Sequence, residues 1–282
     1  MTTRVRELLS RRGLHLTREL GQNFLIDERI AARLADKAGV TADGSVIEVG
    51  TGLGVLTRAL AAKGARVVTV EIDSGLVDAL REEALLPDTV ELIHADALKL
   101  DWDALVDGLA PPVRVVANLP YSAATPLLRR MLDLRSQLSD WSVMVQRELA
   151  ARILAATGQP DYGSFAVLHH LTVDVAEQLT LPPDVFFPRP KVQSSFVRIW
   201  PRRTPLLEPD ELPRVERVIR AAFAQRRKTL QNCLRAGGLA QSGDRAALEA
   251  ALCEAGIDPG VRAEAVEPER LLALVRALGC GA

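Results

Sequence analysis

The fold is decided by Val46-Ile-Glu48-Val-Gly50-Thr-Gly52-Leu-Gly54. Its first half is a short apolar run that predicts a buried strand, and residues 53–63 follow with the apolar spacing of a helix. Glycines at a strand-to-helix turn let the backbone approach a ligand closely. The spacing Gly-x-Gly-x-Gly after an acidic residue differs from the Gly-x-Gly-x-x-Gly of pyrophosphate binders. This stretch therefore predicts a ligand-binding turn of a Rossmann-like fold.

Outward from this turn, short β-branched runs alternate with helical segments such as 74–84, which Ser74 can cap. This alternation predicts βαβ units and a mainly parallel sheet. Two later runs are expected to complete the sheet as an antiparallel edge. The fold class is thus α/β, a Rossmann-like core with a seven-stranded, mainly parallel sheet. The further predicted strands are residues 66–72, 90–94, 114–117, 141–146, 172–181 and 195–199.

The chain of 282 residues is long enough for two domains. Its composition changes to proline and charge over residues 201–213, and beyond them no strand pattern appears. We expect a Rossmann-like domain with a basic N-terminal segment at residues 1–203 and a small all-helical domain at 204–282.

The composition is that of an ordinary soluble globular protein, with 48% hydrophobic and 25% charged residues. No apolar run is long enough for a membrane span, and the N-terminus lacks the apolar region of a secretory signal. Three widely spaced cysteines form neither a disulfide framework nor a Cys-x-x-Cys metal site. A cytoplasmic protein with no membrane contact and no metal is predicted.

The net charge of -1 argues against a nucleic-acid partner, but the charges are unevenly distributed. Residues 186–235 hold 12 basic and 4 acidic side chains, and residues 1–33 hold 7 and 4. Two basic segments therefore coexist with a strongly acidic remainder, and they predict a local phosphate-binding surface.

Acidic residues stand at the ends of three successive predicted strands: Glu48, Glu71 and Asp96. A carboxylate at the end of the second strand is placed to accept both ribose hydroxyls, and Asp96 can accept from an adenine amine. Carboxylates without an anion site suit an adenosine-bearing, cationic, phosphate-free ligand. S-adenosylmethionine fits this description, whereas NAD fits it poorly. The expected binding residues are Glu48, Gly50, Gly52, Glu71, Ile72, Asp96 and Ala97.

The motif Asn118-Leu119-Pro120-Tyr121 follows the fourth predicted strand. The exocyclic amine of adenine is a poor nucleophile, because its lone pair is delocalised into the ring. The Asn118 oxygen and the Leu119 carbonyl can accept its two N–H groups and favour a pyramidal amine. Pro120 fixes the backbone, and Tyr121 offers a stacking face for a base taken out of its helix. These four residues are the predicted catalytic group.

These motifs resemble those of the small-subunit ribosomal RNA adenine N6,N6-dimethyltransferases, the KsgA/RsmA family. The similarity covers residues 20–232 and includes Gly21-Gln-Asn-Phe-Leu25, the glycine turn, Asn-Leu-Pro-Tyr, Phe186-Phe-Pro-Arg-Pro-Lys191-Val-Gln-Ser194 and Phe223-Ala-Gln-Arg-Arg-Lys-Thr-Leu-Gln-Asn232.

The resemblance implies further site residues. Gln22, Asn23, Leu25 and Asn118 would contact S-adenosylmethionine, which leaves as S-adenosylhomocysteine. Phe186 would stack on the target base opposite Tyr121. Basic residues near these motifs are expected to contact RNA, namely Arg189, Lys191, Arg226, Arg227 and Lys228.

The implied reaction is dimethylation of two adjacent adenosines near the 3′ end of 16S ribosomal RNA. The expected partner is an immature 30S-type subunit, in small-subunit biogenesis, and the chain is expected to act as a monomer. Two alternatives stay open: a large-subunit methyltransferase of the macrolide-resistance type, and an assembly factor with secondary methylation activity. An NAD-linked oxidoreductase is a weaker third.

Two positions depart from the usual family pattern. Thr51 stands where the family usually has proline, and Gln193 where it usually has aspartate. Neither position carries the chemistry, so both are expected to affect local rigidity and RNA contact.

Overall fold

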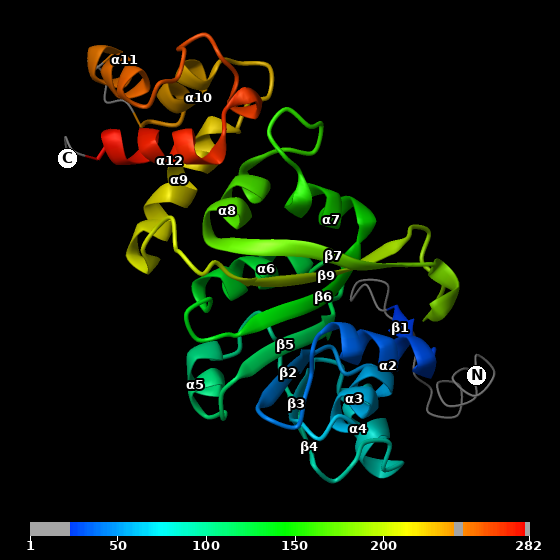
Figure 1. Ribbon diagram of the computed structural model, residues 1–282. Coiled ribbons are helices and arrows are strands. Elements are labelled where there is room, and N and C mark those ends of the chain that lie inside the picture. The colour runs from blue at the N-terminus through cyan, green and yellow to red at the C-terminus, as the bar shows by residue number, and fades with distance from the viewer. Residues whose placement is uncertain (1–22, 240–244, 280–282) are drawn as a thin grey trace. The chain divides into compact units, whose positions relative to one another are not determined.

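A computed structural model describes residues 23–239 and 245–279. In this part of the chain a seven-stranded sheet has the order β4-β3-β2-β5-β6-β9-β7, and Figure 1 shows the strands following one another in this order. The predicted α/β fold with a mainly parallel sheet is confirmed. The strands are β2 (Ser45–Val49), β3 (Arg66–Glu71), β4 (Val90–His94), β5 (Val113–Asn118), β6 (Asp140–Gln146), β7 (Val173–Leu181) and β9 (Ser194–Pro201).

The central strands are buried on both faces, which explains why most of their residues are apolar and β-branched. Ile47, Val68 and Val115 are at most 1% exposed. They lie in register, since β2 pairs in parallel with both β3 and β5. Parallel sheets with covered faces favour such continuous β-branched runs.

The strand order places a topological switch beside β2. The chain runs from β2 outward to β3 and β4, and then returns to β5 on the other side of β2. The carboxyl ends of these four parallel strands meet at one edge, where such sheets form ligand crevices.

Helices follow the strands of the first part of the chain, and side chains cap several of them. The Asp27 carboxylate accepts from the N–H groups of Arg29 and Ile30 and caps the first of these helices. The predicted cap at Ser74 is wrong, because Asp73 accepts from Leu76 N and Ser74 is the first helical residue. The helices are α2 (Glu28–Lys37), α3 (Val55–Ala61), α4 (Ser74–Glu82), α5 (Trp102–Asp107), α6 (Ala124–Asp133) and α7 (Arg147–Leu154).

The antiparallel part of the sheet lies at β6 and β9, which pair with Met144 opposite Phe196. This confirms the expectation of antiparallel strands at that end. A separate two-stranded sheet joins β1 (Phe24–Leu25) to β8 (Phe186–Phe187), with Leu25 opposite Phe186. The sequence did not predict this sheet, because two-residue strands have no detectable period.

Residue contacts divide the chain into two compact units, 1–150 with 176–201 and 151–175 with 202–282. The predicted boundary at 203/204 stays a prediction; the units change at 201/202, and the second also takes in 151–175. The described residues after 201 hold helices and no strand. Elements of the second unit are α8 (Ser164–Thr172), α9 (Leu212–Ala222), α10 (Leu230–Ala236), α11 (Arg245–Glu254) and α12 (Pro268–Ala277), with short 3-10 turns at Pro209–Glu211 and Ala263–Ala265.

Tyr162 shows why residues 151–175 belong to the second unit. Its ring packs edge-on against Phe223 at 5.7 Å between centroids, and its hydroxyl donates to Val266 O at 2.9 Å. These contacts join segments about 60 and 100 residues apart in the chain. Within the residues that the structure describes, every helix is too short or too polar to cross a membrane.

Candidate active site

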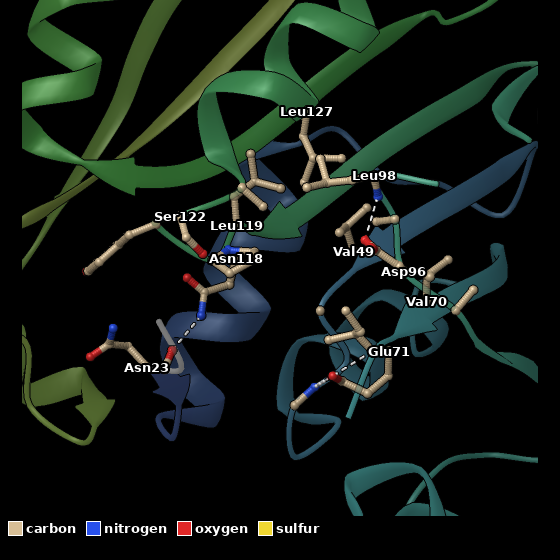
Figure 2. Close-up of a pocket in the computed structure, with 18 of the residues that line it drawn as sticks. Asn23, Val49, Val70, Glu71, Asp96, Leu98, Asn118, Leu119, Ser122 and Leu127 are labelled. Atoms are coloured by element: carbon tan, nitrogen blue, oxygen red, sulfur yellow. Dashed lines mark hydrogen bonds between the residues drawn. The ribbon is translucent and has the colours of Figure 1, made fainter. Parts of the chain in front are cut away.

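The carboxyl ends of β2, β3, β4 and β5 surround a cavity of about 210 Å³. Figure 2 shows residues from these strand ends facing one another across it. The described residues that line it are Asn23, Phe24, Val49, Gly50, Gly52, Val70, Glu71, Ile72, Ala95, Asp96, Ala97, Leu98, Asn118, Leu119, Pro120, Tyr121, Ser122, Ala123 and Leu127.

The glycine turn forms one wall of the cavity through backbone that other residues would adopt with strain. Gly50 and Gly52 have φ angles of 81° and 56°. A Cβ at Gly52 would lie 2.9 Å from Phe24 Cδ1, so a side chain there would collide with the N-terminal segment. Gly50 N donates to Val70 O at 2.8 Å and ties the turn to β3. The turn thus presents fixed backbone to the cavity.

Glu71 ends β3 and holds the turn through three backbone N–H groups. Gly52 N donates to Oε2 at 2.9 Å, while Ile72 N and Asp73 N donate to Oε1 at 2.9 and 3.0 Å. Burial raises the pKa of this carboxyl, and the three backbone hydrogen bonds oppose the rise. A carboxylate has about four acceptor positions, so about one remains for a ligand hydroxyl. From the sequence, two acceptor positions were expected, one for each ribose hydroxyl.

Asp96 follows β4 and also lines the cavity. Its Oδ1 accepts from Leu98 N at 2.9 Å, and Lys99 Nζ lies 3.7 Å from Oδ2. The first contact fixes the side chain in a local turn. Leu98, whose own side chain lines the cavity, is 52% exposed and adds an apolar surface beside this carboxylate.

Asn118, the last residue of β5, has its amide orientation set by the N-terminal segment. Its Nδ2 donates to the Asn23 carbonyl at 2.7 Å, as the dashed line in Figure 2 shows. A flipped amide would place two oxygens against each other, so the nitrogen must face Asn23. The amide oxygen of this cavity-lining residue is therefore left to accept from a ligand.

The rest of the Asn-Leu-Pro-Tyr motif is held by the sheet and by the turn before α6. Leu119 is 1% exposed, and its N–H donates to Met144 O on β6. Pro120 O accepts from Ala123 N at 3.0 Å. The Tyr121 hydroxyl lies 3.2 Å from Ser194 Oγ on β9. The motif is therefore fixed at both ends beside the cavity.

Glu48 lies away from the cavity, which differs from the expected cofactor contact. It is fully buried behind the glycine turn, where Thr57 and Thr69 donate to its Oε2 at 2.6 and 2.7 Å. Glu48 is one residue before the end of β2. Its side chain enters the packed interior, whereas the next residue, Val49, lines the cavity. Burial raises the pKa of Glu48 to about 8. At neutral pH the protonated form therefore predominates, which is unsuited to binding a cation.

Replacing Glu48 with glutamine is expected to flatten the pH dependence of stability. Between the ordinary pKa of 4.5 and the raised value of about 8, the folded protein keeps a proton that the unfolded chain loses. Folding stability conferred by this proton is therefore present below pH 4.5 and lost as the pH rises to 8. The charges that influence it, Glu71 and Arg58, are the same in both proteins. Urea unfolding at pH 5 and pH 8 measures the difference, and equal declines in the two proteins would contradict it.

Two further predicted residues, Leu25 and Phe186, are buried rather than open to the cavity. They are 5% and 3% exposed and belong to one core cluster. The pairing of β1 with β8 places them opposite each other and accounts for their burial. The structure thus does not bring Phe186 into the cavity with Tyr121, and its stacking role remains a prediction.

The predicted RNA-binding residues are exposed but lie in both units. Arg189 and Lys191 belong to the first unit, while Arg226, Arg227 and Lys228 belong to the second. Arg226 donates to Pro160 O at 2.8 Å and lies 3.8 Å from a Glu264 carboxylate oxygen. Part of its hydrogen-bonding capacity is therefore used within the protein. Gln22 lies outside the described residues.

Most of the predicted site nevertheless comes together. The predicted residues that line the cavity are Asn23, Gly50, Gly52, Glu71, Ile72, Asp96, Ala97, Asn118, Leu119, Pro120 and Tyr121. The apolar part of the lining, including Phe24, Leu98 and Leu127, was not predicted from the sequence. Leu98 could have been predicted, because it is a large apolar residue that follows a predicted strand and stands two positions after Asp96, a predicted binding residue.

The charges around the cavity fit an adenosine ligand with a cationic group and no phosphate. Among the described lining residues, Glu71 and Asp96 are acidic and none is Lys, Arg or His. A pyrophosphate would therefore meet no basic side chain among these described lining residues. In the described part of the chain, no three His, Cys, Asp or Glu residues are grouped to hold a metal ion.

A Rossmann-like sheet, this cavity and an Asn-Leu-Pro-Tyr motif at its edge define a methyltransferase of the S-adenosylmethionine-dependent class. Sequence comparison matches residues 13–278 to the family "Ribosomal RNA adenine dimethylase". The chain belongs to this family, and the family predicted from the motifs is confirmed.

Individual relatives share most of their length with the chain. Proteins called "Ribosomal RNA small subunit methyltransferase A" are 38% identical in Moorella thermoacetica, 41% in Myxococcus xanthus and 42% in Rhodospirillum rubrum. The matches cover 96–97% of this chain and 92–95% of the relatives.

Solved structures agree with this fold. The 23S rRNA methyltransferase ErmE has a TM-score of 0.65 at 30% identity, over 91% of this chain and 99% of its own. A dimethyladenosine transferase from Plasmodium falciparum has a TM-score of 0.72 at 22% identity, over 89% and 95%.

Proposed function

We propose that the protein transfers methyl groups from S-adenosylmethionine to the N6 amines of two adjacent adenosines near the 3′ end of 16S ribosomal RNA. Each base becomes N6,N6-dimethyladenosine, and S-adenosylhomocysteine is released. The observation that carries the proposal is the Asn118 amide, which the Asn23 carbonyl orients at the cavity edge. Support for the small subunit comes from the relatives at 37–42% identity, all named for small-subunit ribosomal RNA.

The cavity residues fit the cofactor by their chemistry. Glu71 has an acceptor position for a ribose hydroxyl, and Asp96 has one for the adenine amine. The glycine turn offers backbone without side chains to the part of the cofactor beyond its adenine and ribose. When bound there, S-adenosylmethionine supplies a methyl group on a positively charged sulfur, a good leaving group. No metal takes part in the proposed reaction.

The target amine is activated by acceptors of the Asn-Leu-Pro-Tyr motif. The Asn118 oxygen and the Leu119 carbonyl accept its N–H groups, which turns its lone pair out of conjugation with the ring. Both are neutral acceptors and neither is a base, so the proton leaves to solvent after methylation. Tyr121, held at Ser194, stacks on the base. The protein's main contribution is to position these groups and exclude water.

The test is methyl transfer from radiolabelled S-adenosylmethionine to unmethylated small subunits, followed by nucleoside analysis. Labelled N6,N6-dimethyladenosine in small-subunit RNA is the expected result. Small subunits without this nucleoside would overturn the proposal, and label on large subunits would favour the macrolide-resistance type of reaction. We also propose a cytoplasmic location, an immature 30S-type subunit as the partner and a single copy of the chain as the active form.

Exposed basic residues of the second unit are expected to contact RNA phosphates. Replacing both Arg227 and Lys228 with alanine is expected to reduce the slope of log affinity against log salt by about 1 to 2. Arg220→Ala is the matched control, because its guanidinium already pairs with Glu216 at 2.6 Å. RNA binding measured from low to high salt checks the result. A salt slope that is unchanged in the double variant would remove these residues from the interface.

A further inference from the structure

A chain of hydroxyl groups runs beneath the glycine turn to Glu48. The Thr51 and Thr69 hydroxyl oxygens are 2.7 Å apart, and Thr69 donates to Glu48 Oε2 at 2.7 Å. Thr57 donates to the same oxygen at 2.6 Å from α3. All four side chains are at most 4% exposed. Buried polar groups of this kind are costly unless paired, so their pairing fixes their positions.

The number of hydroxyl protons sets the direction of hydrogen-bond donation from Thr51 to Glu48. Each threonine hydroxyl has one proton, and Thr69 uses its proton toward Glu48. With the Glu48 proton on Oε1, both threonines donate to Oε2, and Thr51 is then the donor in its bond with Thr69. The sequence of donors runs from Thr51 through Thr69 to the carboxyl. Loss of the first hydroxyl removes one bond and leaves no buried donor without an acceptor.

Thr51 connects this buried chain to the wall of the cavity. It stands between Gly50 and Gly52, which line the cavity, but is not itself among the lining residues. Its carbonyl accepts from Gly54 N at 2.9 Å, at the start of α3. Its side chain thus anchors the middle of the turn to β3 from behind, while Glu71 holds Gly52 from the front.

We propose that Thr51 is a positioning residue that fixes the glycine turn for cofactor binding through its hydroxyl bond to Thr69. This inference rests on the proposed function, since it concerns the same cavity. It also gives a role to the position where proline is usual in the family. A hydroxyl anchored in the interior replaces the rigidity that a proline ring supplies.

The test compares Thr51→Val, Thr51→Ser and Thr57→Val by calorimetry with S-adenosylhomocysteine. Thr51→Val is expected to bind it about fivefold to tenfold more weakly, from loss of one buried hydrogen bond. The KM for S-adenosylmethionine is expected to rise by the same factor, while kcat and the KM for RNA stay within about twofold. Thr51→Ser keeps the hydroxyl and is expected to retain the wild-type affinity.

Thr57→Val is the matched control, because it removes a threonine hydroxyl that donates to Glu48 in the same buried network, at a position outside the glycine turn. It is expected to lower the melting temperature without changing affinity for S-adenosylhomocysteine. Equal weakening in the Thr51 and Thr57 valine variants, or wild-type affinity in Thr51→Val, would overturn the inference alone. A wild-type protein that binds no S-adenosylhomocysteine would overturn the proposed function as well.

Discussion

Replacing Asn118 with alanine is expected to slow methyl transfer to adenosine by about 10³-fold, while S-adenosylhomocysteine still binds within about tenfold of the wild-type affinity. The amide oxygen accepts a hydrogen bond from the reacting amine while the lone pair of that amine turns out of conjugation with the adenine ring. Its loss therefore acts on the rate of the chemical step. Single-turnover methylation of unmethylated small subunits measures this rate apart from binding.

Asn118→Asp separates the two roles of the side chain. Aspartate keeps an acceptor for the amine but replaces the Nδ2 donor, so two oxygens meet where Asn118 now donates to the Asn23 carbonyl. We therefore expect a rate between those of the wild type and the alanine variant. Ser122→Ala is the control, since Ser122 lines the same cavity without belonging to the motif. An alanine variant with a rate within tenfold of the wild type would contradict the mechanism.

The same alanine variant tests the assembly-factor alternative. If the protein acts chiefly by binding immature subunits, Asn118→Ala will bind them and still restore subunit assembly in cells that lack the enzyme. If methylation is the main role, binding will persist and restoration will fail. Subunit profiles of such cells distinguish the two outcomes.

The sheet and its functional edge were predictable because local sequence patterns indicate both the strands and the polar residues that follow them. Mostly apolar runs such as Val46–Val49 predict buried parallel strands, and the carboxyl ends of neighbouring parallel strands share an edge. Glu71, Asp96 and Asn118 follow such runs, so their meeting at one cavity follows from chain order. Residue type and topology together were sufficient there.

Residues that depend on side-chain direction were not predictable in this way. Glu48 and Phe186 have the residue types expected of a site, but both enter the interior. One strand position decides whether a side chain faces the cavity or the core, and an apolar run buried on both faces gives no alternation to fix it. The β1–β8 pairing, which buries Phe186, joins segments about 160 residues apart through two residues each.

The division of the chain into two units could not be predicted from local sequence patterns either. Residues 151–175 contain a helical segment that reads as an ordinary connection between strands. Only contacts such as Tyr162 with Phe223 place it with the C-terminal helices. Such contacts are long-range, and their partners are common core residue types with no distinctive motif.

Replacing Glu71 with glutamine is expected to weaken S-adenosylhomocysteine binding by about 10²-fold, although the two side chains have nearly the same shape. Both oxygens of Glu71 accept from backbone N–H groups, Oε2 from Gly52 and Oε1 from Ile72 and Asp73. Glutamine has one acceptor oxygen, so in either orientation its NH₂ group faces a backbone donor. The glycine turn then loses its support, and the ligand loses an acceptor.

Glu48→Gln is the matched control, because the second buried glutamate uses its oxygens differently. Its Oε2 accepts both threonine hydroxyls, while Oε1 has no hydrogen-bond partner among the residues that the structure describes. A glutamine oxygen can replace Oε2 with its NH₂ group at the Oε1 position, so affinity is expected to stay within about threefold. Calorimetry at pH 7 compares the two variants. If Glu48→Gln lost affinity instead, a negative charge at position 48 would be recognising the ligand, and its assignment as a neutral support behind the turn would be wrong.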